Sequence, residues 1–162
     1  MEKISKILRS MIVVSGVVFL DQLTKSQALQ KLSINQTDVI FSWFNLTLRK
    51  NKGVSFGLFP AYSFFEKMLL ISLIVSLIVW IIYQLKNSKD RMEQIGYSLI
   101  IGGALGNLID RICYGSVIDF LEFHLNKYYW PAFNLADSSI VLGAMLVFLK
   151  AVWQFSDNKK WI

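Results

Sequence analysis

Apolar residues gather along this chain into four long runs that are separated by polar stretches. The runs cover residues 11–20, 68–85, 95–109 and 138–149, and the second run holds no formally charged residue. A helix that crosses a bilayer needs about 20 mostly apolar residues. The second run approaches that length by itself, and the others reach it when the polar residues at their ends are included. The pattern therefore predicts four transmembrane helices, at about 10–28, 68–85, 95–110 and 138–155.

The two long connections between these helices make different predictions. In the first, residues 44–49 (FNLTLR) alternate strictly between apolar and polar side chains, which is typical of a β-strand. Residues 51–60 contain two glycines and a proline, and we expect a turn and a second short strand there. The aromatic segment 61–67 is expected to lie along the membrane surface. The second connection, residues 110–137, is expected to be a loop.

These elements predict an all-α integral membrane protein with a small β-containing periplasmic cap. We expect one domain over residues 1–162, because no linker or repeat interrupts the chain. Composition agrees with this fold class, since 54% of the residues are hydrophobic and the mean hydropathy is +0.47. The excess of apolar residues over a typical soluble domain lies within the four runs.

Charge adds a prediction about orientation. The net charge of +6 would suggest a nucleic-acid partner if the protein were soluble. Here the basic residues flank the first run, the connection between the second and third runs, and the end of the fourth. These residues are Lys3, Lys6, Arg9, Lys86, Lys89, Arg91, Lys159 and Lys160. Because cytoplasmic segments next to membrane helices are rich in Lys and Arg, both termini are predicted to be cytoplasmic, and no nucleic acid is expected.

Few side chains in the sequence are suited to redox or metal chemistry. Cys113 is the one cysteine, so no intrachain disulfide can form, and His124 is the one histidine. A His-rich metal site is therefore excluded, and we expect neither a metal nor another cofactor.

The N-terminal segment has some features of a cleavable signal peptide. A basic start and an apolar core are followed by the small residues Ser26 and Ala28. Asp21 and Lys25 come directly after the apolar core, however, and they are spaced i, i+4, at which a helical ion pair can form. This pair favours a retained helix.

The third apolar run ends in polar residues that share one helical face. Gly103, Asn107 and Asp110 follow spacings of four and three residues, so they lie on one side of a helix. A glycine there allows another helix to approach closely. Polar groups at this depth are costly and usually face a bundle interior or a wet cavity. An ion pair between Asp110 and Arg111 at the membrane surface is an alternative without chemistry.

Two further aspartates have ordinary interpretations when each is considered alone. Asp137 precedes an apolar run and has the pattern of a helix N-cap, and Asp119 is an acid in the second connection. With four spans, however, six carboxylates or amides fall near the outer membrane surface: Asp21, Asn51, Asp110, Asp119, Asn134 and Asp137. Two buried carboxylates that lie close together share a proton, which is the arrangement of the aspartic proteases. The sequence spacing leaves open whether Asp119 and Asp137 meet.

Five short blocks, in order along the chain, resemble the bacterial lipoprotein signal peptidase family, signal peptidase II. The blocks are residues 21–25, 51–57, 102–111, 117–120 and 133–138. The resemblance implies a membrane aspartic endopeptidase that removes the signal peptide from diacylglyceryl-modified prolipoproteins just before the lipidated cysteine. It also implies the bacterial cytoplasmic (inner) membrane, with the active site near its outer surface.

The resemblance assigns roles to particular residues. Asp119 and Asp137 match the catalytic aspartates. The positions that match dyad-supporting or substrate-binding residues are Asn51, Gly103, Asn107, Arg111, Asn134 and Ala136, and the structural polar positions are Asp21, Lys25 and Asp110. The family implies inhibition by globomycin-type compounds and contact with membrane lipid, and we expect a monomer. Val54 and Ser55 depart from the alanine pair that is usual in the family.

Two other classes of protein remain open from the residues alone. A small transporter would use membrane carboxylates as a relay, but its polar residues would be spread through the membrane depth. A structural membrane subunit would tolerate amide substitution of either aspartate. Aromatic residues near the surface are expected to anchor the protein in the interface: Phe41, Trp43, Phe44, Phe64 and Phe65.

Overall fold

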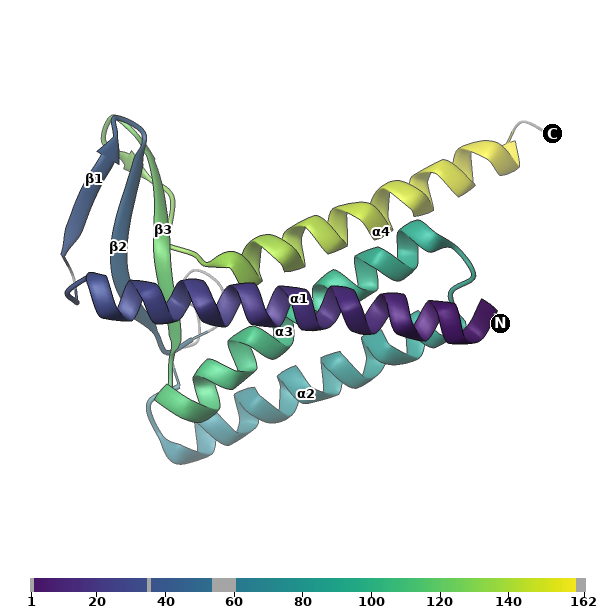
Figure 1. Ribbon diagram of the computed structural model, residues 1–162, viewed down its shortest axis with the longest axis horizontal. Helices are drawn as coiled ribbons and strands as arrows, with labels where there is room; N and C mark the ends of the chain where they lie inside the picture. The colour runs from purple at the N-terminus through teal and green to yellow at the C-terminus, as the bar shows by residue number, and fades with distance from the viewer. Residues whose placement is uncertain (1, 35, 54–60, 160–162) are drawn as a thin grey trace.

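The computed structural model describes residues 2–34, 36–53 and 61–159. Its elements, in chain order, are α1 (Glu2–Lys31), β1 (Thr37–Phe41), β2 (Phe44–Asn51), α2 (Phe64–Asn87), α3 (Arg91–Tyr114), β3 (Val117–Leu125), β4 (Tyr128–Tyr129) and α4 (Leu135–Lys159). The helices run along the long axis of the molecule, with the strands at one end (Figure 1). The start of α1, the end of α4 and the connection between α2 and α3 lie at the opposite end (Figure 1).

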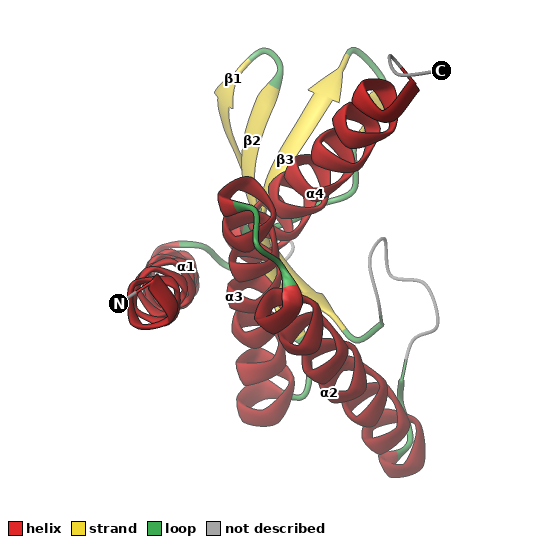
Figure 2. Cartoon of the chain, turned by 90° about the vertical axis from the view of Figure 1, so that its right-hand side faces the viewer, coloured by secondary structure: helices red, strands yellow, loops and turns green. Residues whose placement is uncertain are grey.

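Helix α3 is the centre of the helical part, and it packs against α1, α2 and α4 (Figure 2). Many of its buried residues are small: Gly96, Ser98, Gly102, Gly103 and Gly106. Small residues let helix backbones approach closely, which is how helices associate where no water is available to drive hydrophobic contact.

Helices α3 and α4 approach each other closely, and this approach depends on glycine in both helices. A Cβ atom added at Gly143 would lie 2.5 Å from the carbonyl oxygen of Gly96, and one added at Gly96 would lie 2.8 Å from the carbonyl oxygen of Gly143. At Gly103, an added Cβ would overlap the carbonyl group of Ala136 at the start of α4. Glycine at these positions thus sets the distance between the two helices.

The strands form one antiparallel sheet in the order β1-β2-β3-β4. The strand predicted over residues 44–49 is confirmed within β2. The prediction of a loop throughout 110–137 is wrong, because β3 occupies the middle of it and Phe44 of β2 pairs with Phe123 of β3. The residues of β3 from Val117 to Phe120 are all buried, so both faces are covered and no apolar–polar alternation marks the strand. The fold is therefore predominantly helical with a small antiparallel sheet, rather than all-α.

The helices are longer than the apolar runs predict, because polar capping residues extend them. Helix α2 begins at Phe64, where Ser63 and Glu66 form a capping box. Helix α3 begins after Asp90, whose carboxylate accepts hydrogen bonds from two backbone N–H groups, and it ends at Gly115 with a φ of 68°. Of the aromatic segment 61–67 expected along the membrane surface, residues 64–67 thus form the first turn of α2, and residues 61–63 precede it. The second short strand expected in 51–60 falls mostly on 54–60, outside the described residues.

Among the described residues, two helices are long and apolar enough to cross a membrane: Phe64–Asn87 and Leu135–Ser156. Few of their side chains are buried, and large apolar residues such as Leu73, Trp80 and Phe148 are more than half exposed. Apolar surface of this extent is unfavourable in water, and it is expected for helices that face lipid. These helices indicate a membrane protein.

The glycine contact between α3 and α4 makes a prediction about stability. Gly143→Ala should lower the free energy of unfolding by about 1–3 kcal/mol, because the new methyl group meets a backbone oxygen that cannot rotate away. Thermal unfolding in detergent measures the change. Gly16→Ala in α1 is the matched control, since nothing lies within 4 Å of an added Cβ there. Equal melting temperatures for the two variants would contradict the prediction.

Candidate active site

The start of α4 is fixed by a pair of reciprocal hydrogen bonds. The Asn134 side-chain oxygen accepts a hydrogen bond from the Asp137 backbone N–H at 2.9 Å, and an Asp137 carboxylate oxygen accepts one from the Asn134 backbone N–H at 3.3 Å. This is the capping-box pattern, so Asn134 is the N-cap and Asp137 lies in the first turn. The expectation that Asp137 itself is the N-cap is wrong, because Asn134, three residues earlier, takes that role. The carboxylate of Asp137 is left with an oxygen that faces the neighbouring helix α3.

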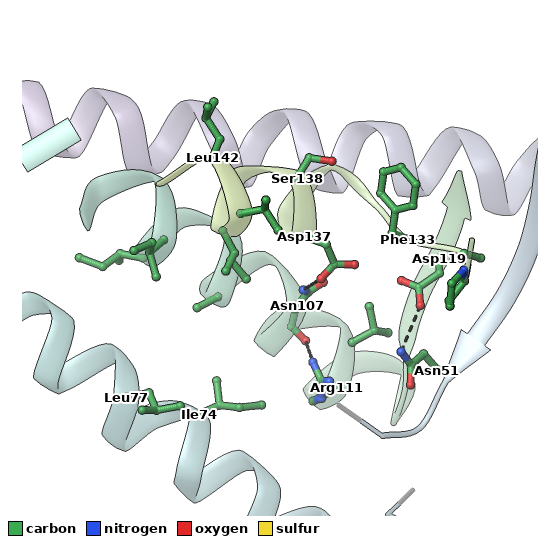
Figure 3. Close-up of a pocket in the computed structure, with 18 of the residues that line it drawn as sticks. Asn51, Ile74, Leu77, Asn107, Arg111, Asp119, Phe133, Asp137, Ser138 and Leu142 are labelled. Atoms are coloured by element: carbon green, nitrogen blue, oxygen red, sulfur yellow. Dashed lines mark hydrogen bonds between the residues drawn. The ribbon is translucent and has the colours of Figure 1, made fainter. Parts of the chain in front are cut away.

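Two asparagines, Asn107 and Asn134, link Asp119 of β3 to Asp137 of α4. Figure 3 shows Asn107 beside Asp137 and Asn51 beside Asp119. The Asn134 amide nitrogen donates to Asp119 at 2.7 Å, and the Asn107 amide nitrogen donates to Asp137 at 2.8 Å. The Asn134 amide also donates to the side-chain oxygen of Asn107 at 3.1 Å. Asn51 of β2 donates to the second oxygen of Asp119 at 3.2 Å. The structure thus links two carboxylates that come from different elements, a strand and a helix. Neutral side-chain amides hold both of them.

The Asp119 carboxylate lies in an environment that favours its protonated form. It is 2% exposed, and burial together with the negative charge of Asp137 raises its pKa. Hydrogen bonds from Asn51 and Asn134 and the charge of Lys25 oppose the rise, and the net result is a pKa of about 7. A protonated Asp119 is therefore favoured far more than it would be for an exposed aspartate.

A buried ion cluster lies directly behind the two carboxylates. The Lys25 ammonium group is 2.8 Å from Asp21 and 2.9 Å from Asp110, and the three side chains are almost inaccessible to solvent. Lys25 also donates to Asn107 at 3.0 Å, which ties the cluster to the amide that holds Asp137. Gln22 donates to both carboxylates of the cluster. The i, i+4 ion pair predicted between Asp21 and Lys25 is confirmed, whereas the alternative pair between Asp110 and Arg111 is wrong, because Asp110 pairs with Lys25.

The same cluster holds the backbone on either side of the site. Asp21 accepts a hydrogen bond from the backbone N–H of Ala136 at 2.9 Å, and Asp110 accepts one from the backbone N–H of Ile118 at 3.0 Å. Ala136 directly precedes Asp137, and Ile118 directly precedes Asp119, so each hydrogen bond holds the backbone next to one of the two linked carboxylates. The ion cluster therefore fixes the positions of α4 and β3 relative to α1 and α3.

Arg111 connects the site to the chain after β2. Its guanidinium group donates to the carbonyl oxygen of Asn107 at 3.0 Å and to that of Gly53 at 2.6 Å. Gly53 in turn donates its backbone N–H to the Asn51 side chain at 2.9 Å, beside the amide group that contacts Asp119. Arg111 thus positions Asn51 through the backbone rather than by pairing with a carboxylate.

A pocket of about 940 Å³ extends from the two carboxylates along the helices. Its walls are mostly apolar and come from α2, α3 and α4, and its polar lining residues lie at the end near the sheet (Figure 3). The apolar walls include Ile74, Leu77, Ile78, Ile81, Ile101, Ala104, Val141 and Met145. A pocket of this kind accepts an apolar segment along its length and presents the carboxylates to one end of it.

The predicted site residues divide into three groups in the structure. Those that line the pocket are Asn51, Asn107, Arg111, Asp119 and Asp137. Asn134 and Ala136 lie behind them at the start of α4, where Gly103 of α3 packs against Ala136. Asp21, Lys25 and Asp110 form the ion cluster. Gln22 was not predicted, and its place one residue after Asp21 is the signal that would have found it. The role of the Ile118 backbone N–H has no signal in the sequence, because any residue except proline supplies that group.

The fold is similar to that of known membrane enzymes. Two solved structures of bacterial membrane enzymes are similar to the chain. One has a TM-score of 0.83 and 26% sequence identity, and the match covers 92% of this chain and 90% of that one. The other has a TM-score of 0.78 and 27% identity, and the match covers 88% and 92% of the two chains.

Sequence comparison identifies the family. Residues 13–153 match the family model of signal peptidase (SPase) II, and the chain belongs to this family of proteases. It is 42% identical to a lipoprotein signal peptidase of Burkholderia mallei over 132 residues, which cover 81% of this chain and 80% of the relative. It is 36% identical to one of Wigglesworthia glossinidia brevipalpis, with coverages of 86% and 91%. The transporter and structural-subunit alternatives receive no support from these matches.

The ion cluster makes a prediction that does not depend on catalysis. Lys25→Met should lower the free energy of unfolding by about 3–5 kcal/mol, because Asp21 and Asp110 would be left buried without a counter-charge. Thermal unfolding in detergent measures the loss. Lys31→Met, at an exposed position in the same helix, is the matched control and should change the melting temperature little. A Lys25→Met protein as stable as this control would show that the cluster does not hold the fold together.

Proposed function

We propose that the chain is an aspartic endopeptidase that removes the signal peptide from diacylglyceryl-modified prolipoproteins, cutting just before the lipidated cysteine. Membership of the signal peptidase II family supplies the protease class and the lipoprotein substrates. The observation that supports the aspartic mechanism is the pair Asp119 and Asp137, held by two bridging amides at the polar end of an apolar pocket.

The pair would catalyse hydrolysis by dividing two roles between its members. Asp119, whose raised pKa favours the protonated form, would donate its proton to the oxygen of the scissile carbonyl. Asp137, ionised, would take a proton from a water molecule. At the same time, the oxygen of that water molecule would bond to the carbonyl carbon. When the tetrahedral intermediate collapses, the C–N bond breaks, the leaving nitrogen takes the proton from Asp137, and Asp119 recovers its own. No metal or other cofactor takes part in this sequence.

The surrounding residues would keep this pair in place. Asn107 and Asn134 bridge the carboxylates, and Asn51 orients Asp119 through the contact that Arg111 supports. Gly103 and Ala136 would contribute by close packing, since the carbonyl group of Ala136 occupies the space that a Cβ at position 103 would need. The ion cluster of Asp21, Lys25 and Asp110 would serve a structural role behind the site.

We further propose that all four helices cross the membrane as one domain over residues 1–162. Each has 24 residues or more, which corresponds to at least about 36 Å of helix, enough for a hydrocarbon layer of about 30 Å. Helix α1 presents large apolar side chains outward, including Met11, Ile12 and Phe19. Helix α3 is enclosed by the other helices, so its polar residues do not need to face lipid.

The distribution of charge supports an orientation with both termini in the cytoplasm. The basic residues around the start of α1 and the connection between α2 and α3 lie at the end of the molecule away from the sheet (Figure 1). The carboxylate pair would then lie near the outer surface of the bacterial inner membrane. A prolipoprotein whose signal segment spans the membrane would present its cleavage site at that depth.

Other partners follow from the same site. Membrane lipid would contact the exposed apolar faces of the helices, and globomycin-type inhibitors would compete for the pocket. We also propose that the protein acts as a monomer.

Amide substitution of either aspartate tests the proposal. Asp119→Asn and Asp137→Asn should each reduce kcat for a diacylglyceryl-modified prolipoprotein by about 10²–10⁴-fold, because an amide supplies neither the acid nor the base. The amount of cleaved product and its new N-terminus are measured in detergent. Glu122→Gln, on the same strand as Asp119, is the matched control and should retain activity. An Asp variant that is folded and nearly as active as this control would overturn the assignment.

The raised pKa of Asp119 predicts the pH dependence of the reaction. Because Asp119 must donate a proton, kcat/KM should fall as the pH rises through about 7, where that proton is lost. Asn51→Val removes a hydrogen bond that lowers the pKa of Asp119, so the fall should move to higher pH. The pH profile of Asn87→Ala, an exposed residue at the far end of α2, should match that of the wild type. A fall that stays at the same pH in Asn51→Val contradicts the role given to Asp119.

A further inference from the structure

A row of aromatic rings leads from the candidate active site to the tip of the sheet. The ring centroid of Phe133 lies 5.5 Å from that of Phe123, with the two rings tilted against each other. Phe123 stacks on Trp43 at 5.8 Å, and Trp43 stacks on Phe41 at 5.4 Å. We call Phe41, Trp43, Phe123 and Phe133 the aromatic row. Phe44 packs beside it, against Trp43 and Phe123. The signal peptidase reaction as proposed above assigns no task to these rings.

The row begins at the carboxylate pair. Phe123 and Phe133 line the same pocket as Asp119 and Asp137. Phe123 is four residues beyond Asp119 on β3, and side chains at even spacing project from the same face of a strand. Phe133 is held to β3 by backbone hydrogen bonds with Leu121. The row is therefore an extension of the pocket surface along the sheet.

The row is also open along most of its length. Phe41 is 55% exposed, Trp43 51% and Phe123 41%, which is unusual for a continuous group of large aromatic side chains. Exposed apolar surface that continues from a substrate pocket indicates a binding surface for an apolar part of the substrate.

The aromatic row runs in a different direction from the rest of the pocket. The apolar walls from α2 and α4 follow the helix axes, whereas the strands run across those axes at the level of the carboxylates (Figures 1 and 2). A membrane-spanning signal segment fits the first direction. A group attached to the cysteine at the cleavage site starts at the level of the carboxylates, so it fits the direction of the strands.

The chemistry of the row favours an acyl chain over a peptide. The backbone of β3 beside the row is already paired: the N–H of His124 donates to Trp43, and the carbonyl of Phe123 accepts from Trp130. At Phe123 and His124, where the row meets the pocket, these backbone groups of β3 are therefore not free for an extended peptide. The ring faces offer apolar contact without hydrogen-bonding groups, apart from the indole N–H of Trp43.

We propose that the aromatic row is the subsite for an acyl chain of the diacylglyceryl group on the substrate cysteine. This inference rests on the proposed function and names the part of the enzyme that reads the lipid. Each methylene group laid against the rings is removed from water, so binding through the row increases with acyl-chain length.

Two lipopeptides of the same sequence test the inference, one carrying hexadecanoyl chains and the other hexanoyl chains on its diacylglyceryl cysteine. The measured quantity is the ratio of kcat/KM for the long-chain substrate to that for the short-chain substrate, in one detergent. Trp43→Ala should lower this ratio by about tenfold, with the loss in KM for the long-chain substrate. Trp43→Leu should retain most of the ratio, because it keeps apolar contact.

Tyr128→Ala is the matched control. Tyr128 is an aromatic residue of the same sheet that is 72% exposed and lies outside the row. Its variant should keep the wild-type ratio. A Trp43→Ala ratio equal to that of the wild type overturns the inference. An equal loss on both substrates also overturns it, and indicates instead that Trp43 anchors the sheet to the bilayer.

A binding measurement separates the inference from the proposed function. In Asp119→Asn protein, which leaves the row intact, the long-chain lipopeptide should bind more tightly than the short-chain one, and adding Trp43→Ala should remove most of that difference. If the wild type cleaves neither lipopeptide, the proposed function fails while this binding comparison still decides the acyl subsite. Equal affinities for the two lipopeptides in the Asp119→Asn protein overturn the inference whether or not cleavage occurs.

Discussion

The burial of one ammonium group between two carboxylates is the constraint on which the rest of this structure depends. Lys25 lies between Asp21 and Asp110 where no solvent reaches them, so each charge is stable only while its partners are present. Both carboxylates also hold backbone N–H groups, one at the start of α4 and one in β3. The cluster therefore makes the geometry of the site a consequence of correct helix packing.

The protein separates its polar chemistry from its apolar binding surface. Ionic and amide groups lie at the sheet end of the bundle, while the walls farther along the pocket are aliphatic side chains from three helices. Glycines in α3 and α4 allow the backbones to meet, so the polar groups of the central helix are enclosed by protein. A membrane protein can in this way keep charged residues close to hydrocarbon without exposing them to it.

Sequence reasoning succeeded where a pattern is local. The apolar runs predicted the helices, alternation predicted the strand at 44–49, and i, i+4 spacing predicted the pair of Asp21 with Lys25. Sequence reasoning failed where two contacting residues are far apart in the sequence. The contact of Lys25 with Asp110 depends on how two helices are rotated against each other, and β3 carries no alternation because both of its faces are covered. That Asp119 and Asp137 approach each other follows from these tertiary contacts and from no local signal.

The order of the elements along the chain has a consequence for biosynthesis. Asp119 lies in β3, and Asp137 lies in the first turn of α4, which follows β3 along the chain. The ion cluster also needs this helix for its full set of contacts, because Asp21 accepts a hydrogen bond from the backbone N–H of Ala136. A nascent chain that stops between β3 and α4 thus has Asp119 without Asp137 and an incomplete ion cluster scaffold. The carboxylate pair is complete only after the start of α4 has been made, so a shorter nascent chain would lack the activity proposed above.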